Sequence, residues 1–131
     1  MANVIYNSFK RDIMNGSIDL AVDTLKLALV TSAYVPDIDA HTKFSDITNE
    51  VVGAGYTAGG EVLTGQLVSV DNDTDKGIFD AIDVSWLDAT ITARGAVLYK
   101  SRGGASTDDE LIGYLDFVTD IVSTNGNFNL L

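Results

Sequence analysis

The run Ala89–Lys100 is the longest stretch of alternating side chains in this sequence, and it limits the possible folds more than any other feature. A period of two residues is that of a β-strand, in which successive side chains point to opposite faces. We therefore expect a long strand with one face in the core. That face comprises Ile91, Ala93, Gly95, Val97 and Tyr99, and the other comprises Thr92, Arg94, Ala96, Leu98 and Lys100.

Several shorter strand patterns surround this run. They predict strands at 24–31, 67–71, 77–86, 111–117 and 128–131, and a short one at 18–22. The pattern at 77–86 breaks strict alternation, which indicates an irregularity. Turns are expected at 72–76 and at Asn125-Gly126, a dipeptide typical of hairpins. Such spacing is typical of a mainly β fold, a β-sandwich or jelly-roll-like domain, with Leu27, Trp86 and Val97 in its core.

One helix is expected, near the N-terminus. Phe9 and Ile13 lie one helical turn apart with Met14 beside them, Asn7 or Ser8 can cap the start, and Asn15-Gly16 is a stop signal. We expect this short helix to dock its apolar edge on the core. The remaining segments are expected to be loops: a polar one at 32–43 followed by a helical turn at 44–47, a glycine-rich one at 50–64, and a flexible one at 101–110.

Length and composition indicate one domain, residues 1–131. The chain has no cysteine, so neither disulfides nor thiolate metal sites are expected, and assembly in a reducing cytoplasm is compatible with this. Residues 1–11 lack a basic segment followed by an apolar run, so no secretory signal is expected. No run approaches 18 apolar residues, so no membrane partner is expected either.

The net charge of −11 argues against binding to nucleic acid. Affinity for phosphate backbones comes largely from lysine and arginine, and the eight basic residues here are scattered along the chain. Acidity of this degree favours solubility at high local concentration.

Two acidic patterns deserve comparison with metal sites. Asp71–Gly77 alternates acids as a calcium loop does, but Lys76 stands where that loop requires glycine and Ile82 where it requires glutamate. A solvated hairpin turn is the preferred interpretation, and weak calcium binding is the alternative. Asp37, Asp39 and His41 also alternate, yet the chain has no second histidine to complete a zinc site. We predict no metal site and no cofactor.

No catalytic motif is apparent. A serine triad would have to use His41, and no Gly-x-Ser-x-Gly elbow is present. The glycine-rich segment 53–60 lacks the Lys-Ser or Lys-Thr of a phosphate loop. We predict that the protein is not an enzyme and has no catalytic residues.

Five runs, in the same order along the chain, resemble a family of small virion proteins of tailed bacteriophages. They are Tyr6–Gly16, Leu27–Tyr34, Phe44–Val51, Gly55–Gly60 and Ile91–Val97. Family members are described as phage structural proteins, and some are capsid decoration, or cement, proteins. The resemblance implies a virion component on the outside of the head.

This reading predicts protein partners: the major capsid protein, and other copies of this chain in a dimer or trimer. A tail, collar or head-fibre component, or a module that binds a host receptor or glycan, is the alternative. Contacts are expected from the N-terminal segment and from two loop tyrosines, because strand interiors are committed to the core. The predicted contact residues are Ala2, Asn3, Val4, Tyr6, Phe9, Tyr34 and Tyr56.

Overall fold

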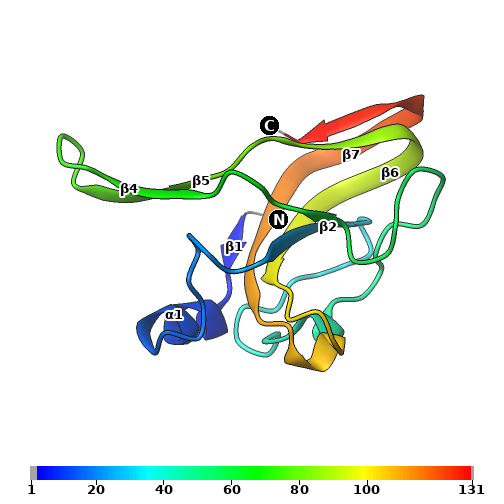
Figure 1. Ribbon diagram of the computed structural model, residues 1–131. Helices are drawn as coiled ribbons and strands as arrows, with labels where there is room; N and C mark the ends of the chain where they lie inside the picture. The colour runs from blue at the N-terminus through cyan, green and yellow to red at the C-terminus, as the bar shows by residue number, and fades with distance from the viewer. Residues whose placement is uncertain (1–2, 131) are drawn as a thin grey trace.

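Two antiparallel sheets and one short α-helix make up the chain, as seen in a computed structural model that describes residues 3–130 (Figure 1). The larger sheet has the strand order β1-β7-β6-β2-β3, and the smaller pairs β4 with β5. The predicted fold class, mainly β and β-sandwich-like with a short N-terminal helix, is confirmed. The elements are β1 (Val4–Ile5), α1 (Asn7–Met14), β2 (Leu25–Val30), the 3-10 turn η1 (Phe44–Asp46), β3 (Glu61–Val62), β4 (Leu67–Asp71), β5 (Lys76–Asp80), β6 (Val84–Lys100), the 3-10 turn η2 (Ser106–Asp108) and β7 (Leu111–Leu130).

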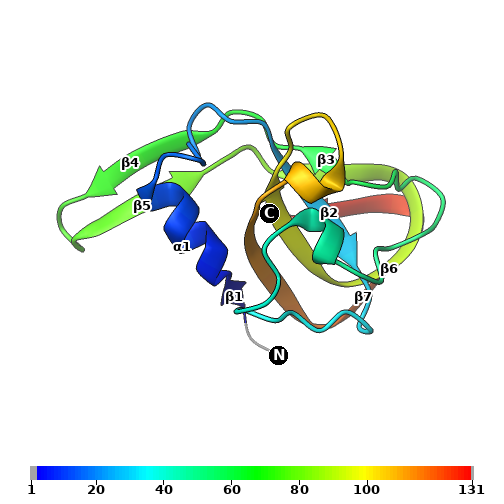
Figure 2. The same ribbon diagram turned by 90° about the horizontal axis from the view of Figure 1, so that it is seen from below.

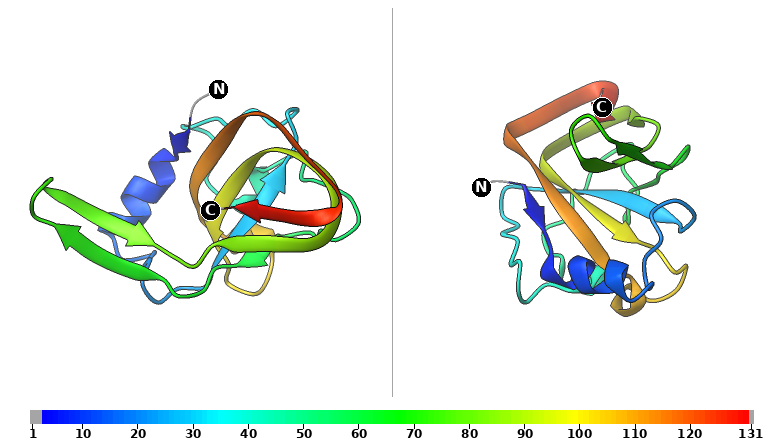
Figure 3. Two further views of the ribbon diagram at one scale, coloured as in Figure 1. Left: turned by 90° about the horizontal axis from the view of Figure 1, so that it is seen from above. Right: turned by 90° about the vertical axis from the view of Figure 1, so that its left-hand side faces the viewer.

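The long strands β6 and β7 pair with each other along most of their length and curl over the core (Figure 3). Their register shifts at four places, among them between Trp86 and Ala89 and between Ala93 and Gly95. Bulges of this kind bend a strand and increase its twist. The curl therefore lets one ladder enclose Trp86, which is 1% exposed and lies edge-on to Phe128.

Strand β2 of the large sheet is covered on both faces. Leu25, Leu27 and Leu29 of β2 pack in the same cluster as Trp86, while Ala28 and Val30 belong to a second cluster rich in tyrosine. A strand buried on both faces is nearly continuous in its apolar residues, as β2 is. The predicted burial of Leu27, Trp86 and Val97 is confirmed.

The predicted strand at 18–22 is wrong, because this segment forms a turn. The amides of Val22 and Asp23 donate to the carbonyl of Asp19, and the Asp19 side chain accepts from the amide of Ala21. An aspartate that bonds to the backbone two residues ahead stabilises a turn in place of an extended strand. Ile18 is nevertheless buried in the core.

The predicted hairpin at Asn125-Gly126 is also wrong, because β7 continues through both residues to Leu130. Asn125 has a positive φ of 48°, and Gly126 pairs with Ala89 of β6. The amide of Asn125 donates to Oγ1 of Thr90, which ties the irregular residue to the neighbouring strand. The dipeptide therefore forms a bulge, since the tertiary pairing with β6 keeps the chain in one direction.

The helix forms where expected, but it presents a different side to the protein. Its buried residues are Ser8 and Asp12, while Ile13 and Met14 are exposed, and Phe9 is half-buried against the core. β1 pairs with β7 directly before the helix, and the intervening residue, Tyr6, is fully buried. These anchors fix the orientation of the first helical turn, so of the predicted apolar edge only Phe9 docks on the core, while Ile13 and Met14 do not.

Candidate functional site

The β4–β5 hairpin projects away from the rest of the chain as an arm (Figures 1 and 2). Its strands pair from Leu67 with Asp80 to Asp71 with Lys76, as the sequence predicted for β4 and the following turn. The predicted strand at 77–86, however, breaks at 81–83, so that β5 belongs to the arm and β6 to the large sheet. We call residues 67–80 the arm throughout.

The tip of the arm is an aspartate-capped turn. Oδ1 of Asp71 accepts from the amides of Asp73 and Thr74 at 3.0 and 3.3 Å, and Oδ2 accepts from the Thr74 hydroxyl at 2.8 Å. The Thr74 hydroxyl is the chief reason that the pKa of Asp71 is lowered, followed by the two amides. Asp75 takes the positive φ of 55° that the turn requires, a conformation that aspartate tolerates better than most residues.

Exposed aliphatic side chains cover the arm between its tip and its base. Leu67 is 60% exposed and Val70 72% exposed, and Val68 and Ile78 are also exposed. Val68 and Val70 share one face of the ribbon, since they lie two residues apart on the same strand. Apolar groups gathered on one projecting element are typical of a surface that binds another macromolecule.

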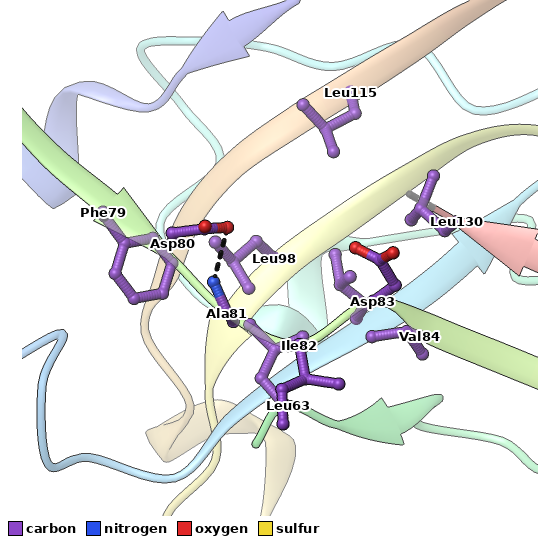
Figure 4. Close-up of a pocket in the computed structure, with 11 residues that line it drawn as sticks. Leu63, Phe79, Asp80, Ala81, Ile82, Asp83, Val84, Leu98, Leu115 and Leu130 are labelled. Carbon is purple, nitrogen blue, oxygen red and sulfur yellow. Dashed lines mark hydrogen bonds between the residues drawn. The ribbon is translucent and has the colours of Figure 1, made fainter. Parts of the chain in front are cut away.

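An open cleft of about 320 Å³ lies where the arm meets the body (Figure 4). Its walls come from both parts: Phe79 and Ile82 from the arm and its link to β6, and Val84, Leu98 and Leu115 from β6 and β7. The lining is completed by Leu27, Leu63, Asp80, Ala81, Asp83 and Leu130. A segment seated in this cleft would therefore touch the arm and the sheet together.

Three hydrogen bonds fasten the base of the arm. The side-chain amide of Gln66 donates to the carbonyls of Leu20 at 2.9 Å and Asp23 at 2.8 Å, and the amide of Ile82 donates to the carbonyl of Thr64. On the side toward α1, Val68 and Leu20 line a second shallow hollow. These hydrogen bonds hold the base of the arm, while Val68 and Val70 beyond it remain exposed.

The predicted contact residues Tyr6 and Tyr34 are not on the surface. Both are buried, and their hydroxyls lie 2.7 Å apart. Burial is the main cause of the raised pKa of each, which reaches about 12 for Tyr34. Tyr34 also bonds to Nδ1 of His41 at 2.9 Å. We correct the prediction for these two residues: they hold the second core cluster together.

The glycine-rich loop is anchored through Tyr56, which is half-buried. Its hydroxyl donates to Oε2 of Glu50 at 2.5 Å and accepts from the amide of Leu29 at 2.9 Å. Burial, followed by the bond to Glu50, raises the pKa of Tyr56 far above its usual value. Gly59 also donates to Glu50, and its carbonyl accepts from the hydroxyl of Tyr99. The hydroxyl of Tyr56, a predicted contact residue, is therefore used in bonds within the chain.

The predicted N-terminal contacts fall into three situations. Ala2 lies outside the described residues. Asn3 is exposed, and its side-chain oxygen accepts from the amide of Asp116 at 2.7 Å, while Val4 pairs with Tyr114 of β7. Phe9 packs against the core with part of its ring exposed. From Asn3 onward the segment is therefore not a free arm, since it adds a short strand to the large sheet.

The acidic pattern around His41 is occupied by bonds within its own loop. One carboxylate oxygen of Asp37 accepts from the amides of Asp39 and Ala40, and these bonds lower the pKa of Asp37. Within residues 3–130 no group of three or more histidine, cysteine, aspartate or glutamate residues is placed to hold a metal ion. No helix in this part of the chain is long and apolar enough to cross a membrane.

Comparison with known proteins identifies no relative: no protein-family model, curated protein or solved structure matches this chain.

Sequence reasoning predicted the strand at 67–71 and the turn at 72–76, but it ran the second strand on to residue 86 and missed that the hairpin is a candidate binding element. The available signal was the link Ala81–Asp83, which follows Asp80 and breaks the alternation that would have joined the hairpin to the next strand. Nothing in the sequence around Leu67, Val68 and Val70 distinguishes these exposed residues from the apolar residues of a buried strand.

Proposed function

We propose that this chain is a structural protein of a tailed-bacteriophage virion, a capsid decoration protein that binds the outside of the head. Its partner is the major capsid protein, and further copies of the chain associate with it as a dimer or trimer. The proposal assigns no catalytic activity and no cofactor to the chain, and places it neither on a membrane nor on nucleic acid.

The observation that carries the proposal is the projecting arm, with Leu67, Val68, Val70 and Ile78 exposed. A single chain gains nothing in stability from aliphatic side chains held in water, so their burial against another protein is the favourable outcome. The resemblance of five sequence runs to small phage virion proteins supports a capsid protein as this partner.

Mass action explains how such a chain would stabilise a shell. A protein that binds the assembled lattice and not its separated subunits lowers the free energy of the assembled state. Many copies on one lattice make modest affinity at each site sufficient. The net charge of −11 suits an exterior position, because packaged DNA would repel an acidic protein from the interior.

Copy number tests the proposal. Quantitative mass spectrometry of purified virions should find tens to hundreds of copies, the order of magnitude expected for a repeated lattice. Heads from a phage with the gene deleted should assemble and then rupture more easily on heating or chelation. About three to twelve copies would indicate a tail, collar or fibre position of low symmetry instead. A protein absent from virions that binds host cells would support the receptor-binding alternative.

A further inference from the structure

We propose that the arm inserts into an apolar protein groove flanked by basic residues, and that this groove belongs to a different chain. The inference rests on the proposed function, since it takes the groove to lie on the head surface. It specifies the contacting element and the chemistry of its receptor. Three observations support it: the arm is incompletely packed, it has the size of an interface, and it carries concentrated negative charge.

The arm is incomplete as a structural unit. Within residues 3–130 no further strand pairs with the outer edge of β4 or of β5. An isolated two-stranded ribbon is marginally stable in water, and three strands or a packed face are needed for independent stability. Exposed backbone edges and the open Val68–Val70 face therefore leave two kinds of contact for a partner to complete.

The arm also has the dimensions of a binding element. Five paired residues at about 3.3 Å each give strands roughly 17 Å long, to which the turn at the tip adds. Enclosing such a ribbon on both faces buries an area on the order of the 800 Å² that each partner contributes to a standard interface. The arm alone can thus provide a specific contact.

Charge identifies the partner. Between Leu67 and Asp83 the chain has five aspartates and one lysine, a net charge of −4 out of the total of −11. Asp71 uses its carboxylate within the turn, whereas those of Asp73 and Asp75 are exposed and have no bonded partner in the described part of the chain. A complementary surface presents lysine or arginine beside the apolar groove, which steers the encounter and fixes the orientation of the arm.

The same charges disfavour a second copy of this chain as the receptor. The cleft at the base of the arm has Asp80 and Asp83 in its lining (Figure 4), and the hollow beside Val68 has Asp19. Seating the acidic tip of another arm there would bring like charges together in a partly desolvated site. Like-charge contacts across an interface are strongly unfavourable, so a basic groove on another chain is the better match.

The test uses heads purified from a phage with the gene deleted and titrates the full-length chain onto them. Val70→Ser should weaken binding about tenfold, because it removes an aliphatic group that the groove would bury. Val122→Ser is the matched control: Val122 is also a strand valine, 66% exposed, but lies on β7. It should bind as the wild-type chain does. Far-UV circular dichroism and melting curves verify that both variants fold.

Charge is tested with a second matched pair. Asp73→Asn with Asp75→Asn, and Glu61→Gln with Asp88→Asn, each remove two exposed carboxylates and leave the net charge at −9. The arm pair should weaken binding roughly three- to tenfold at low salt, as two exposed charge contacts would. It should also flatten the salt dependence of binding. The control pair should change affinity much less.

Each result decides a separate point. Failure of the wild-type chain to bind heads would contradict the proposed function, and this inference with it. Tight binding by the wild-type chain and by both arm variants would overturn the inference alone. Equal losses for the arm and control charge pairs would show that general attraction of the acidic chain to the head, and not a basic groove for the arm, sets the affinity, and would overturn the inference. A dimer in sedimentation velocity that is lost in Val70→Ser would identify a second copy as the receptor and also overturn the inference.

Discussion

Arg102 and Glu110 form a two-point ion pair that closes the loop between β6 and β7. Nε of Arg102 donates to Oε1 of Glu110 at 2.6 Å, and Nη2 donates to Oε2 at 2.7 Å. The Glu110 side chain is buried while that of Arg102 is 44% exposed. The bonds from Arg102 lower the pKa of Glu110 despite the opposing effect of burial. The segment expected to be a flexible loop is thus held at both ends.

This pair makes stability depend on acid. Because the pKa of Glu110 is lower in the folded chain than in the unfolded one, its contribution is complete above about pH 4.5 and is lost as the pH falls through the folded-state value. Glu110→Gln should lower the free energy of unfolding by about 1–3 kcal/mol at pH 7. The difference from the wild-type chain should shrink at pH 3. Urea denaturation at both pH values measures this, with exposed Glu61→Gln as the control. An unchanged difference at pH 3 would contradict the assignment.

Gly95 is covered by the ring of Tyr114, and a side chain there should be destabilising. A Cβ built at Gly95 would lie 2.5 Å from Cε1 and from the hydroxyl of Tyr114, whereas at Gly77, on the arm, it would meet nothing within 4 Å. Gly95→Ala should cost about 1–3 kcal/mol, the usual penalty of overpacking. Gly77→Ala should change the free energy of unfolding by less than about 0.5 kcal/mol. Chemical denaturation of both variants makes the comparison, and equal effects would show that the ring moves aside freely.

Local patterns predicted the elements whose causes are local. The alternation at 67–71 gave β4, the turn signals at 72–76 gave the tip of the hairpin, and the long alternation ending at Lys100 gave most of β6. In both cases the period of side-chain burial and the turn chemistry are properties of neighbouring residues. The helical turn predicted at 44–47 is likewise present, as the 3-10 turn Phe44–Asp46.

The errors share a different cause. Tyr6 and Tyr34 were expected at the surface, yet their hydroxyls meet across 28 residues of sequence. Asn125-Gly126 has the composition of a hairpin, and only the pairing of Gly126 with Ala89 makes it a bulge. Such pairings join distant parts of the chain, so a single sequence gives no local sign of them.

The candidate site was missed for a related reason. Whether a hairpin packs on a sheet or projects from it is decided by the residues around it, in this case the link at 81–83 and the anchor at Gln66. The apolar content of β4 is compatible with either outcome. Exposure, the property that marks the arm as a binding element, therefore required the tertiary structure.

Burial separates two leucines that look alike in the sequence. Leu27 is 7% exposed in the core, and Leu67 is 60% exposed on the arm, although both lie in strands. Leu27→Ala should lower the free energy of unfolding by about 2–5 kcal/mol. Leu67→Ala should lower it by less than about 1 kcal/mol, because its removal leaves no cavity. Thermal and urea denaturation measure both. A cost for Leu27 below about 0.5 kcal/mol would show that this face of β2 is poorly packed.

The tip of the arm should not bind calcium tightly. Asp71 already accepts three hydrogen bonds from the turn, so a cation would have to displace the bond from Thr74 or share the remaining lone pairs. Calorimetry should detect no micromolar affinity for calcium, and adding calcium at about 1 mM should leave the melting temperature unchanged. Micromolar binding that disappears in Asp73→Ala would contradict this prediction and assign the turn as a calcium site.

The arm should also be the first strand pair to open in solution. Among residues 3–130, β4 and β5 pair only with each other, whereas β2 lies between β6 and β3 and is buried on both faces. Amide exchange reports local opening, which is easiest where few apolar groups are buried. After correction for intrinsic rates, amides in 67–80 should exchange at least about tenfold faster than those in 25–30. Mass spectrometry at several protein concentrations provides the control, because protection that grows with concentration would signal self-association. Equal protection of both segments in dilute solution would mean that the arm packs onto its own chain. On binding to heads, the amides of the arm should become protected while those of β2 remain unchanged.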